Sequence, residues 1–134
     1  MSNVNLNGYK VSEISFVNTA ENGKKLQLQN KYSYNVKYAN NGTCVGELGV
    51  EVYDKEAPEV FKVKLVMIGV FSITNQEATK ETLHIETYKD LFPYARVLIS
   101  NLTVNAGVPP IILQGMDIEK QSIYKIEKNP PEDL

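Results

Sequence analysis

The sequence has little of the chemistry on which most enzymes and metal sites depend. Its 134 residues include one cysteine, Cys44, and one histidine, His84. A single cysteine excludes an intramolecular disulfide, and two such residues fall short of the four ligands that structural zinc usually takes. The motifs of phosphate-binding loops, serine hydrolases, thiol redox proteins and zinc proteases are missing from the sequence. We therefore expect no catalysis and no cofactor.

His84 and Cys44 are each better explained by structural roles than by reactivity. His84 is the one side chain whose unperturbed pKa lies near neutral pH, but no nucleophile is spaced to meet it. Cys44 opens a predicted strand, and no cationic cluster surrounds it in sequence to lower its pKa. We expect a solvated helix histidine and a cysteine that packs in or beside a sheet.

Charge and hydropathy exclude two further classes of protein. The net charge is −2 and the basic residues are scattered, whereas nucleic-acid binding normally needs a basic patch. No apolar run approaches the roughly 20 residues that cross a bilayer. The first ten residues lack the basic and apolar parts of a signal peptide. We expect one cytoplasmic domain over residues 1–128, followed by a disordered acidic tail at 129–134.

The first half of the chain alternates between apolar and polar residues as strands do. This alternation predicts four strands, at about residues 6–17, 25–39, 43–53 and 59–73. Asn22-Gly23 and Asn41-Gly42 supply turns, because both residue types tolerate positive φ. In the second strand the even positions are apolar or tyrosine, and Asn30 is the one exception.

Two of these strands depart from simple alternation. Tyr9 and Val11 share one parity, while Ile14 and Phe16 share the other. Either a bulge lies near residues 12–13 or both faces of the first strand are covered. The end of the fourth strand is apolar on both faces, so its second face needs another subunit, a bound partner or a crossing segment.

The second half of the chain changes to helical spacing. Apolar residues recur every three or four positions over residues 79–105, which predicts one amphipathic helix. Pro93 lies inside it and predicts a kink or two abutting helices. Gly107 is a good helix stop.

The remaining residues predict a loop and a last short helix. Pro109-Pro110 enforces an extended segment, and Asp117 can cap a helix over residues 118–128. Four strands followed by helices predict an α+β fold, in which a four-stranded antiparallel sheet is covered on one side by helices.

Three tyrosines, Tyr32, Tyr34 and Tyr38, share one face of the second strand. Two interpretations of this stripe stay open. The residues can be core, because tyrosine favours strands. They can also form an aromatic wall for peptide chains, because tyrosine offers a large contact area and a polar tip.

Four short stretches carry a distinctive set of residues. Residues 91–96 read LFPYAR and residues 107–113 read GVPPIIL. Residues 13–16 read EISF and residues 69–73 read GVFSI. These stretches resemble the helix, the loop after it and two strands of the SecB family of protein-export chaperones. The pieces occur in the family's order and at suitable separations.

The resemblance implies an ATP-independent holdase that assembles as a homotetramer, a dimer of dimers. Unfolded or exported polypeptides would lie in apolar grooves between the sheet and the loop after the long helix. The client-binding residues that it implies are Leu26, Leu28, Tyr32, Tyr34, Val108, Ile111, Ile112, Leu113 and Met116. The subunit contacts that it implies involve Leu91, Tyr94, Leu98, Ile99 and Leu102.

The resemblance also implies docking to the export motor SecA through acidic residues on the outer side of the sheet. Glu13 matches one such place, but Lys64 and Val17 stand where the family has acidic residues, which should weaken docking to a basic surface. Three alternatives stay open. The first is a holdase, either general or dedicated to one client such as an antitoxin, and the second is a scaffold that binds a folded partner. The third is a small enzyme, which the scarcity of catalytic residue types disfavours.

Overall fold

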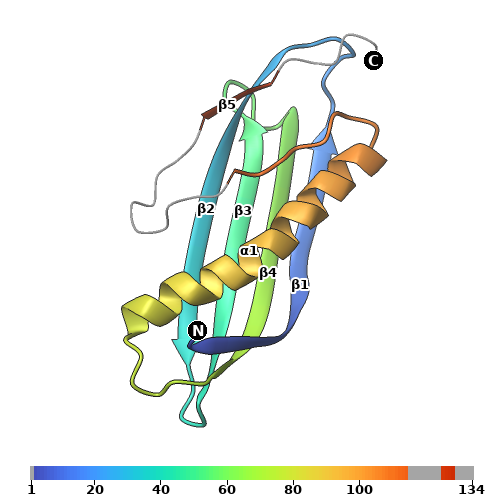
Figure 1. Cartoon of the computed structure of the whole chain (residues 1–134). Coiled ribbons are helices and arrows are strands. Elements are labelled where there is room, and N and C mark those ends of the chain that lie inside the picture. Colours follow the sequence, from blue (N-terminus) through green and yellow to red (C-terminus); the bar gives the residue numbers. More distant parts are fainter. Residues whose placement is uncertain (1, 115–124, 129–134) are drawn as a thin grey trace.

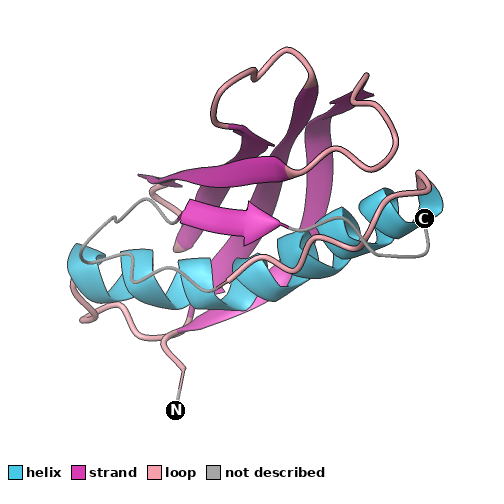
Figure 2. Ribbon diagram, turned by 90° about the horizontal axis from the view of Figure 1, so that it is seen from above, coloured by secondary structure: helices cyan, strands magenta, loops and turns pink. Residues whose placement is uncertain are grey.

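The computed structural model describes residues 2–114 and 125–128. The elements are β1 Val4–Asn18, β2 Leu26–Tyr38, β3 Thr43–Asp54, β4 Phe61–Ile73, α1 Lys80–Asn105 and β5 Lys125–Lys128. The helix lies across one face of an antiparallel sheet, whose strands are in the order β1-β4-β3-β2-β5 (Figure 1). Figure 2 shows the same two layers from above. The α+β fold, the four predicted strands and the long helix are confirmed.

The core lies between the sheet and α1, and alternation in the two central strands builds it. Leu48 of β3 pairs with Met67 of β4, and Val50 pairs with Leu65. All four side chains are fully buried. Each such side chain contributes roughly 1.5–3 kcal/mol when it leaves water, so this paired row anchors the helix on the inner face of the sheet.

A bulge in β1 resolves the conflict of parity. The β1–β4 register shifts between Val11 and Glu13. Val11 therefore lies opposite Met67 and Ile14 opposite Leu65, both on the inner face. The predicted bulge near residues 12–13 is confirmed, and the extra residue lets both halves of β1 turn their apolar side chains toward α1.

The connection from β1 to β2 crosses the end of the sheet, because β4 and β3 lie between these strands. Thr19 at its start donates its N–H to the Val60 carbonyl at 2.8 Å. Gly23 within it has φ 85°, and Gly42 in the β2–β3 hairpin has φ 77°. Residues 19–25 thus bring a loop to the end of the sheet where β4 begins.

The helix begins and ends as its sequence predicts, but it is not divided. The Thr79 hydroxyl accepts the Thr82 N–H at 3.1 Å and caps the first turn. Gly107, with φ 85°, follows the last turn. α1 runs through Pro93 without a break, which excludes the two abutting helices that the sequence allowed. Pro93 is exposed, so water can bind the carbonyl that loses its helical partner.

The last described residues correct one prediction. A helix was predicted over residues 118–128, but Lys125–Lys128 form the strand β5, antiparallel to residues 26–29 of β2. The sheet therefore has five strands. The physical reason is the outer edge of β2, whose N–H and C=O groups a short strand can pair. Residues 118–124 and the predicted acidic tail lie outside the described residues.

The outer face of the sheet stays uncovered by any described element. Val66 and Ile68 of β4 are half-buried between the side chains of the neighbouring strands, whereas Val70 keeps 43% exposure. The cover that the sequence requires for the second face of β4 is not supplied by the described part of this chain.

Tyr34 spans the layer between the sheet and α1. Its hydroxyl donates a hydrogen bond to Thr87 Oγ1 at 2.5 Å, and Thr87 bonds back to the His84 carbonyl. Burial raises the pKa of Tyr34, while the bond to Thr87 acts in the opposite direction. Gly46 provides the space that this arrangement needs, since a Cβ there would overlap the tyrosine hydroxyl.

Gly46→Ala is therefore expected to lower the free energy of unfolding by about 1–3 kcal/mol, because the added methyl displaces Tyr34 from its bond to Thr87. Urea denaturation measures the change. The matched control is Gly8→Ala, whose Cβ meets nothing within 4 Å; it should change stability by less than about 0.5 kcal/mol. Equal losses in the two variants would contradict this packing.

Candidate functional site

The path of α1 divides the inner face of the sheet into unequal parts. Figure 1 shows the helix running diagonally, from the β2 side of the sheet to the β1 side. After Gly107 the chain turns back across the sheet as an extended segment, residues 108–114, which we call the return segment. It covers the part of the inner face that α1 leaves open at the end of the sheet where β4 begins.

The return segment alternates between buried and exposed side chains. Ile111 keeps 4% exposure and Leu113 none, whereas Ile112 between them is 53% exposed. This period of two is that of an extended chain lying flat on a surface. Ile111 and Leu113 thus belong to the core, while Ile112 between them belongs to the surface.

Polar contacts tie the return segment to the rest of the fold. The Ile111 N–H donates to Thr103 Oγ1 at 2.9 Å, and the Tyr32 hydroxyl donates to the Gln114 carbonyl at 3.2 Å. Asn30, the exception in the β2 pattern, is fully buried and donates from Nδ2 to the same tyrosine hydroxyl at 3.1 Å. These bonds hold the segment against β2.

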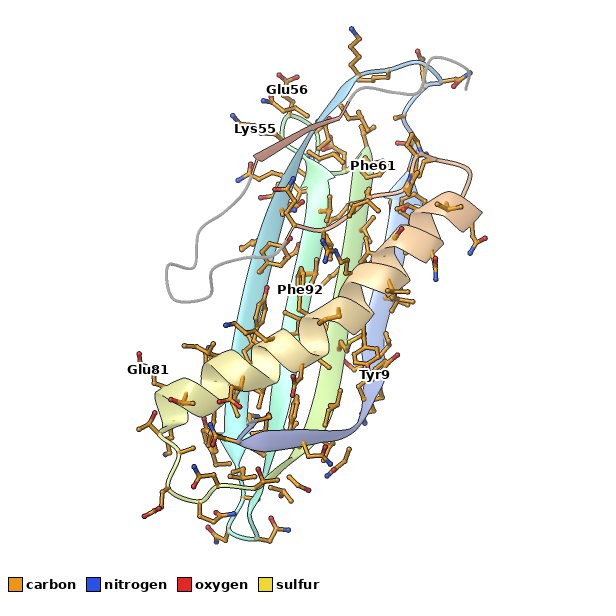
Figure 3. The ribbon with its side chains drawn as sticks, viewed as in Figure 1. Tyr9, Lys55, Glu56, Phe61, Glu81 and Phe92 are labelled. Carbon is orange, nitrogen blue, oxygen red and sulfur yellow. The ribbon has the colours of Figure 1, made fainter. Side chains whose placement is uncertain are left out.

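An open cavity of about 230 Å³ lies where the return segment begins. Leu26, Phe61 and Val108 form its apolar wall, and Glu21 and Lys24 also line it. Figure 3 shows Phe61 at the start of β4, beside the return segment. Small-molecule sites usually measure roughly 300–1,000 Å³. The cavity is smaller than these and suits one or two side chains of a polypeptide better than a cofactor.

The predicted client-binding residues fall into separate environments. Leu26 and Val108, far apart in sequence, meet in the cavity, and Ile112 lies exposed on the surface. Tyr32 is half-buried with its ring edge-on to Phe92, at 6.0 Å between centroids. Met116 lies outside the described residues. Four others are buried in the core: Leu28, Tyr34, Ile111 and Leu113.

The two residues with reactive side chains are both packed. Cys44 is fully buried, and burial raises the pKa of its thiol, which keeps it protonated. His84 is half-buried rather than solvated, with its ring 5.1 Å from that of Tyr34. Within residues 2–114 and 125–128 no three potential metal ligands come together, and no helix is long and apolar enough to span a membrane.

The predicted subunit-contact residues are divided between the two sides of α1. Leu91 and Ile99 face the sheet and are fully buried. Leu98 and Leu102 are half-buried against the core. Only Tyr94 is well exposed, at 45%.

Tyr94 belongs to a larger exposed apolar surface that sequence reasoning missed. Its ring stacks on that of Tyr9 at 4.8 Å between centroids, and Figure 3 shows Tyr9 on β1 beside the helix. The sequence did contain an indication of this surface. Apolar residues extend around more of the circumference of α1 than the face that packs on the sheet, and Tyr94, Val97 and Val104 stay exposed. We call this surface the β1–α1 patch; it comprises Tyr9, Val11, Ile14, Tyr94, Val97 and Val104.

The predicted docking residue Glu13 lies on the outer face and forms an ion pair. Its carboxylate is 3.4 Å from Lys64 Nζ, across the β1–β4 pair. Exposed pairs of this kind contribute roughly 0.2–1 kcal/mol. Lys64 therefore offsets the charge of the acidic residue beside it.

Comparison with known proteins identifies the family. A sequence model of the family described as preprotein translocase subunit SecB matches residues 13–129. The chain belongs to the SecB family. The family resemblance of its helix and loop motifs is thereby confirmed.

Curated SecB proteins match part of the chain. It is similar to the protein-export protein SecB of Neorickettsia sennetsu, with 41% identity over 68 residues, which cover 46% of this chain and 42% of that one. The SecB of Mesorhizobium japonicum is 38% identical over 79 residues, covering 58% and 46%. The matched stretch spans about half the length of these relatives.

A solved SecB-like structure shares the fold over almost the whole chain. It is a SecB-like chaperone of Mycobacterium tuberculosis in complex with a peptide from an antitoxin. The TM-score is 0.66, and the match covers 86% of this chain and 88% of that one at 17% identity. At this identity the likeness establishes the fold.

Proposed function

We propose that this SecB-family protein is a cytoplasmic, ATP-independent holdase that binds unfolded or exported polypeptides in apolar grooves. The observation that carries the proposal is the cavity in which Leu26 of β2 meets Val108 of the return segment. An open hollow of side-chain size with an apolar wall binds a client side chain by non-directional burial against that wall, which tolerates many client sequences. That tolerance is what a holdase requires, and it needs neither a nucleotide nor a catalytic group.

The energetics of one cavity favour an assembly of several. Burial of one leucine-sized side chain contributes roughly 1.5–3 kcal/mol to binding. A dissociation constant of 1 mM already requires a binding free energy of about 4.1 kcal/mol, so one buried side chain alone binds more weakly than that. A long unfolded chain gains useful affinity only by filling several such sites at once. We therefore infer that function depends on more than one copy of the chain.

The nature of the client is supported by the structural relative, whose chaperone holds a peptide from an antitoxin. A polypeptide client also suits this chain, because its cavity of about 230 Å³ has room for one or two side chains of a polypeptide. For SecA we infer a weak attraction, because a basic partner surface would meet Glu13 already paired with Lys64.

The proposal is tested by suppression of aggregation. A chemically unfolded model protein is diluted out of denaturant with increasing amounts of this protein and without nucleotide, and light scattering is followed. We expect suppression near stoichiometric ratios. No suppression by the folded protein would overturn the general holdase and leave a chaperone dedicated to one client or a scaffold.

In the same assay Val108→Glu should suppress aggregation much less well, because a carboxylate on the apolar wall of the cavity must be dehydrated before a client side chain can pack there. About tenfold more protein is expected for equal suppression, equivalent to about 1.4 kcal/mol of client binding. The control is Val17→Glu, which changes an exposed valine on the outer face of the sheet and should leave suppression intact. Equal loss in both variants would count against the cavity.

For the assembly, we propose that a second copy covers the β1–α1 patch. Six apolar side chains gathered at one edge of a monomer are an aggregation hazard, and a self-complementary two-fold contact removes it. Two such dimers would make the homotetramer that the family resemblance implies.

Val97→Glu, at the most exposed of these residues, should lower the native mass measured by sedimentation, because two copies of the carboxylate would face an apolar contact. The control Glu81→Lys reverses a charge in the first turn of α1, away from the patch, and should keep the wild-type mass. A wild-type mass of 15.0 kDa, that of one chain, would contradict the proposed contact.

A further inference from the structure

The return segment has the form of a peptide bound to the sheet. It crosses the inner face as an extended chain, from the end of α1 toward β2 (Figure 1), and its residues belong to no helix or strand. Ile111 and Leu113 are buried at alternate positions, while Ile112 between them is exposed. An unfolded client that lay on the same surface would bury alternate side chains in the same way.

Side chains of α1 and β2, rather than a neighbouring strand, hold the backbone of this segment. The Ile111 N–H donates to Thr103 Oγ1 at 2.9 Å, and the Gln114 carbonyl accepts the Tyr32 hydroxyl at 3.2 Å. Release of the segment therefore requires these bonds to break and two apolar side chains to leave the sheet, while α1 and the strands stay in place. Local opening of this kind costs less free energy than unfolding of the whole domain.

A buried polar atom without a partner lies beside this attachment. Asn30 is fully buried on the inner side of β2, and its Nδ2 donates to the Tyr32 hydroxyl at 3.1 Å. Its Oδ1 has no hydrogen-bond partner among the residues that the structure describes. A buried amide oxygen left without a donor is destabilising. The return segment thus leaves unused an acceptor that the backbone N–H of another extended chain could satisfy.

We propose that the return segment is a displaceable strap, and that a client segment with apolar residues at alternate positions takes its place on the sheet. The inference rests on the proposed function and states how access to that site is regulated. The client fills the space of Ile111 and Leu113, and its backbone donates to Asn30 Oδ1. Without a client, the return segment keeps this apolar surface covered, which limits aggregation. The apparent affinity is then lowered by the small fraction of molecules in which the segment is released.

The first test is Tyr32→Phe, which removes the hydroxyl bond to Gln114 and keeps the aromatic ring. The probe is a fluorescent ten-residue peptide that alternates leucine with serine, and its binding is followed by anisotropy. We expect about fivefold tighter binding, because loss of one hydrogen bond releases the return segment more often. If the segment were a fixed wall of the site, the same loss would leave binding unchanged or weaken it.

The control is Tyr38→Phe, on the same strand. The Tyr38 hydroxyl also donates to a backbone carbonyl at 3.2 Å, but this carbonyl belongs to Lys80 at the start of α1. The variant loses an equivalent bond without loosening the return segment, so its binding should match that of the wild type. Thr103→Val removes the acceptor of the Ile111 N–H and should tighten binding, whereas Thr103→Ser keeps the hydroxyl and should not.

Hydrogen exchange tests release of the return segment in the unchanged protein. The Ile111 amide is bonded to Thr103 in a buried position, and it should exchange faster when the probe binds, because the probe takes the place of the segment. The Val50 amide, in the central strand β3, should keep its rate. Slower or unchanged exchange at Ile111, or equal or weaker binding by both Tyr32→Phe and Thr103→Val, would overturn the displaceable strap.

These outcomes are separate from the fate of the proposed function. If the wild-type protein suppresses aggregation while exchange at Ile111 slows on probe binding, the holdase stands and the client lies over a fixed return segment. If the wild-type protein neither suppresses aggregation nor binds the probe, the general-holdase function itself is wrong, and the inference that rests on it is wrong as well.

Discussion

A single helix cannot cover this sheet, and the functional surfaces follow from that mismatch. An α-helix with its side chains is roughly 10–12 Å wide, whereas five strands at about 4.8 Å spacing span roughly 20 Å. α1 crosses diagonally and leaves an uncovered part on each side. The return segment covers one and leaves the cavity at Val108, while the other remains open as the β1–α1 patch. The proposed client site and the proposed subunit contact are thus two consequences of one packing arrangement.

The interaction that these surfaces offer a polypeptide is mainly the burial of apolar side chains. Cys44 and His84 are packed within the fold, and the ion pair of Glu13 with Lys64 offsets charge on the outer face. Such a surface discriminates weakly between sequences but distinguishes unfolded chains, which expose apolar side chains and unpaired backbone, from folded ones.

The local pattern of apolar and polar residues was sufficient to predict the strands, the helix and the bulge, because each of these depends on residues that are neighbours in sequence. The parity conflict between Val11 and Ile14 has only two geometric solutions, and one of them is observed. The burial of Ile111 and Leu113 was not predictable, since it depends on the crossing direction of α1. The strand at residues 125–128 was missed because four residues fit helix and strand alike, and the open edge of β2 decides between them.

Photo-crosslinking from the cavity tests most directly whether the uncovered part of the sheet receives unfolded chains. A benzophenone amino acid replaces Val108 in one variant and Val17, on the outer face, in the other, and each is illuminated with an unfolded or a folded model protein. We predict adducts from position 108 with the unfolded protein only, and few from position 17. Adducts from position 17 alone, or equal adducts with the folded protein, would contradict the proposed site.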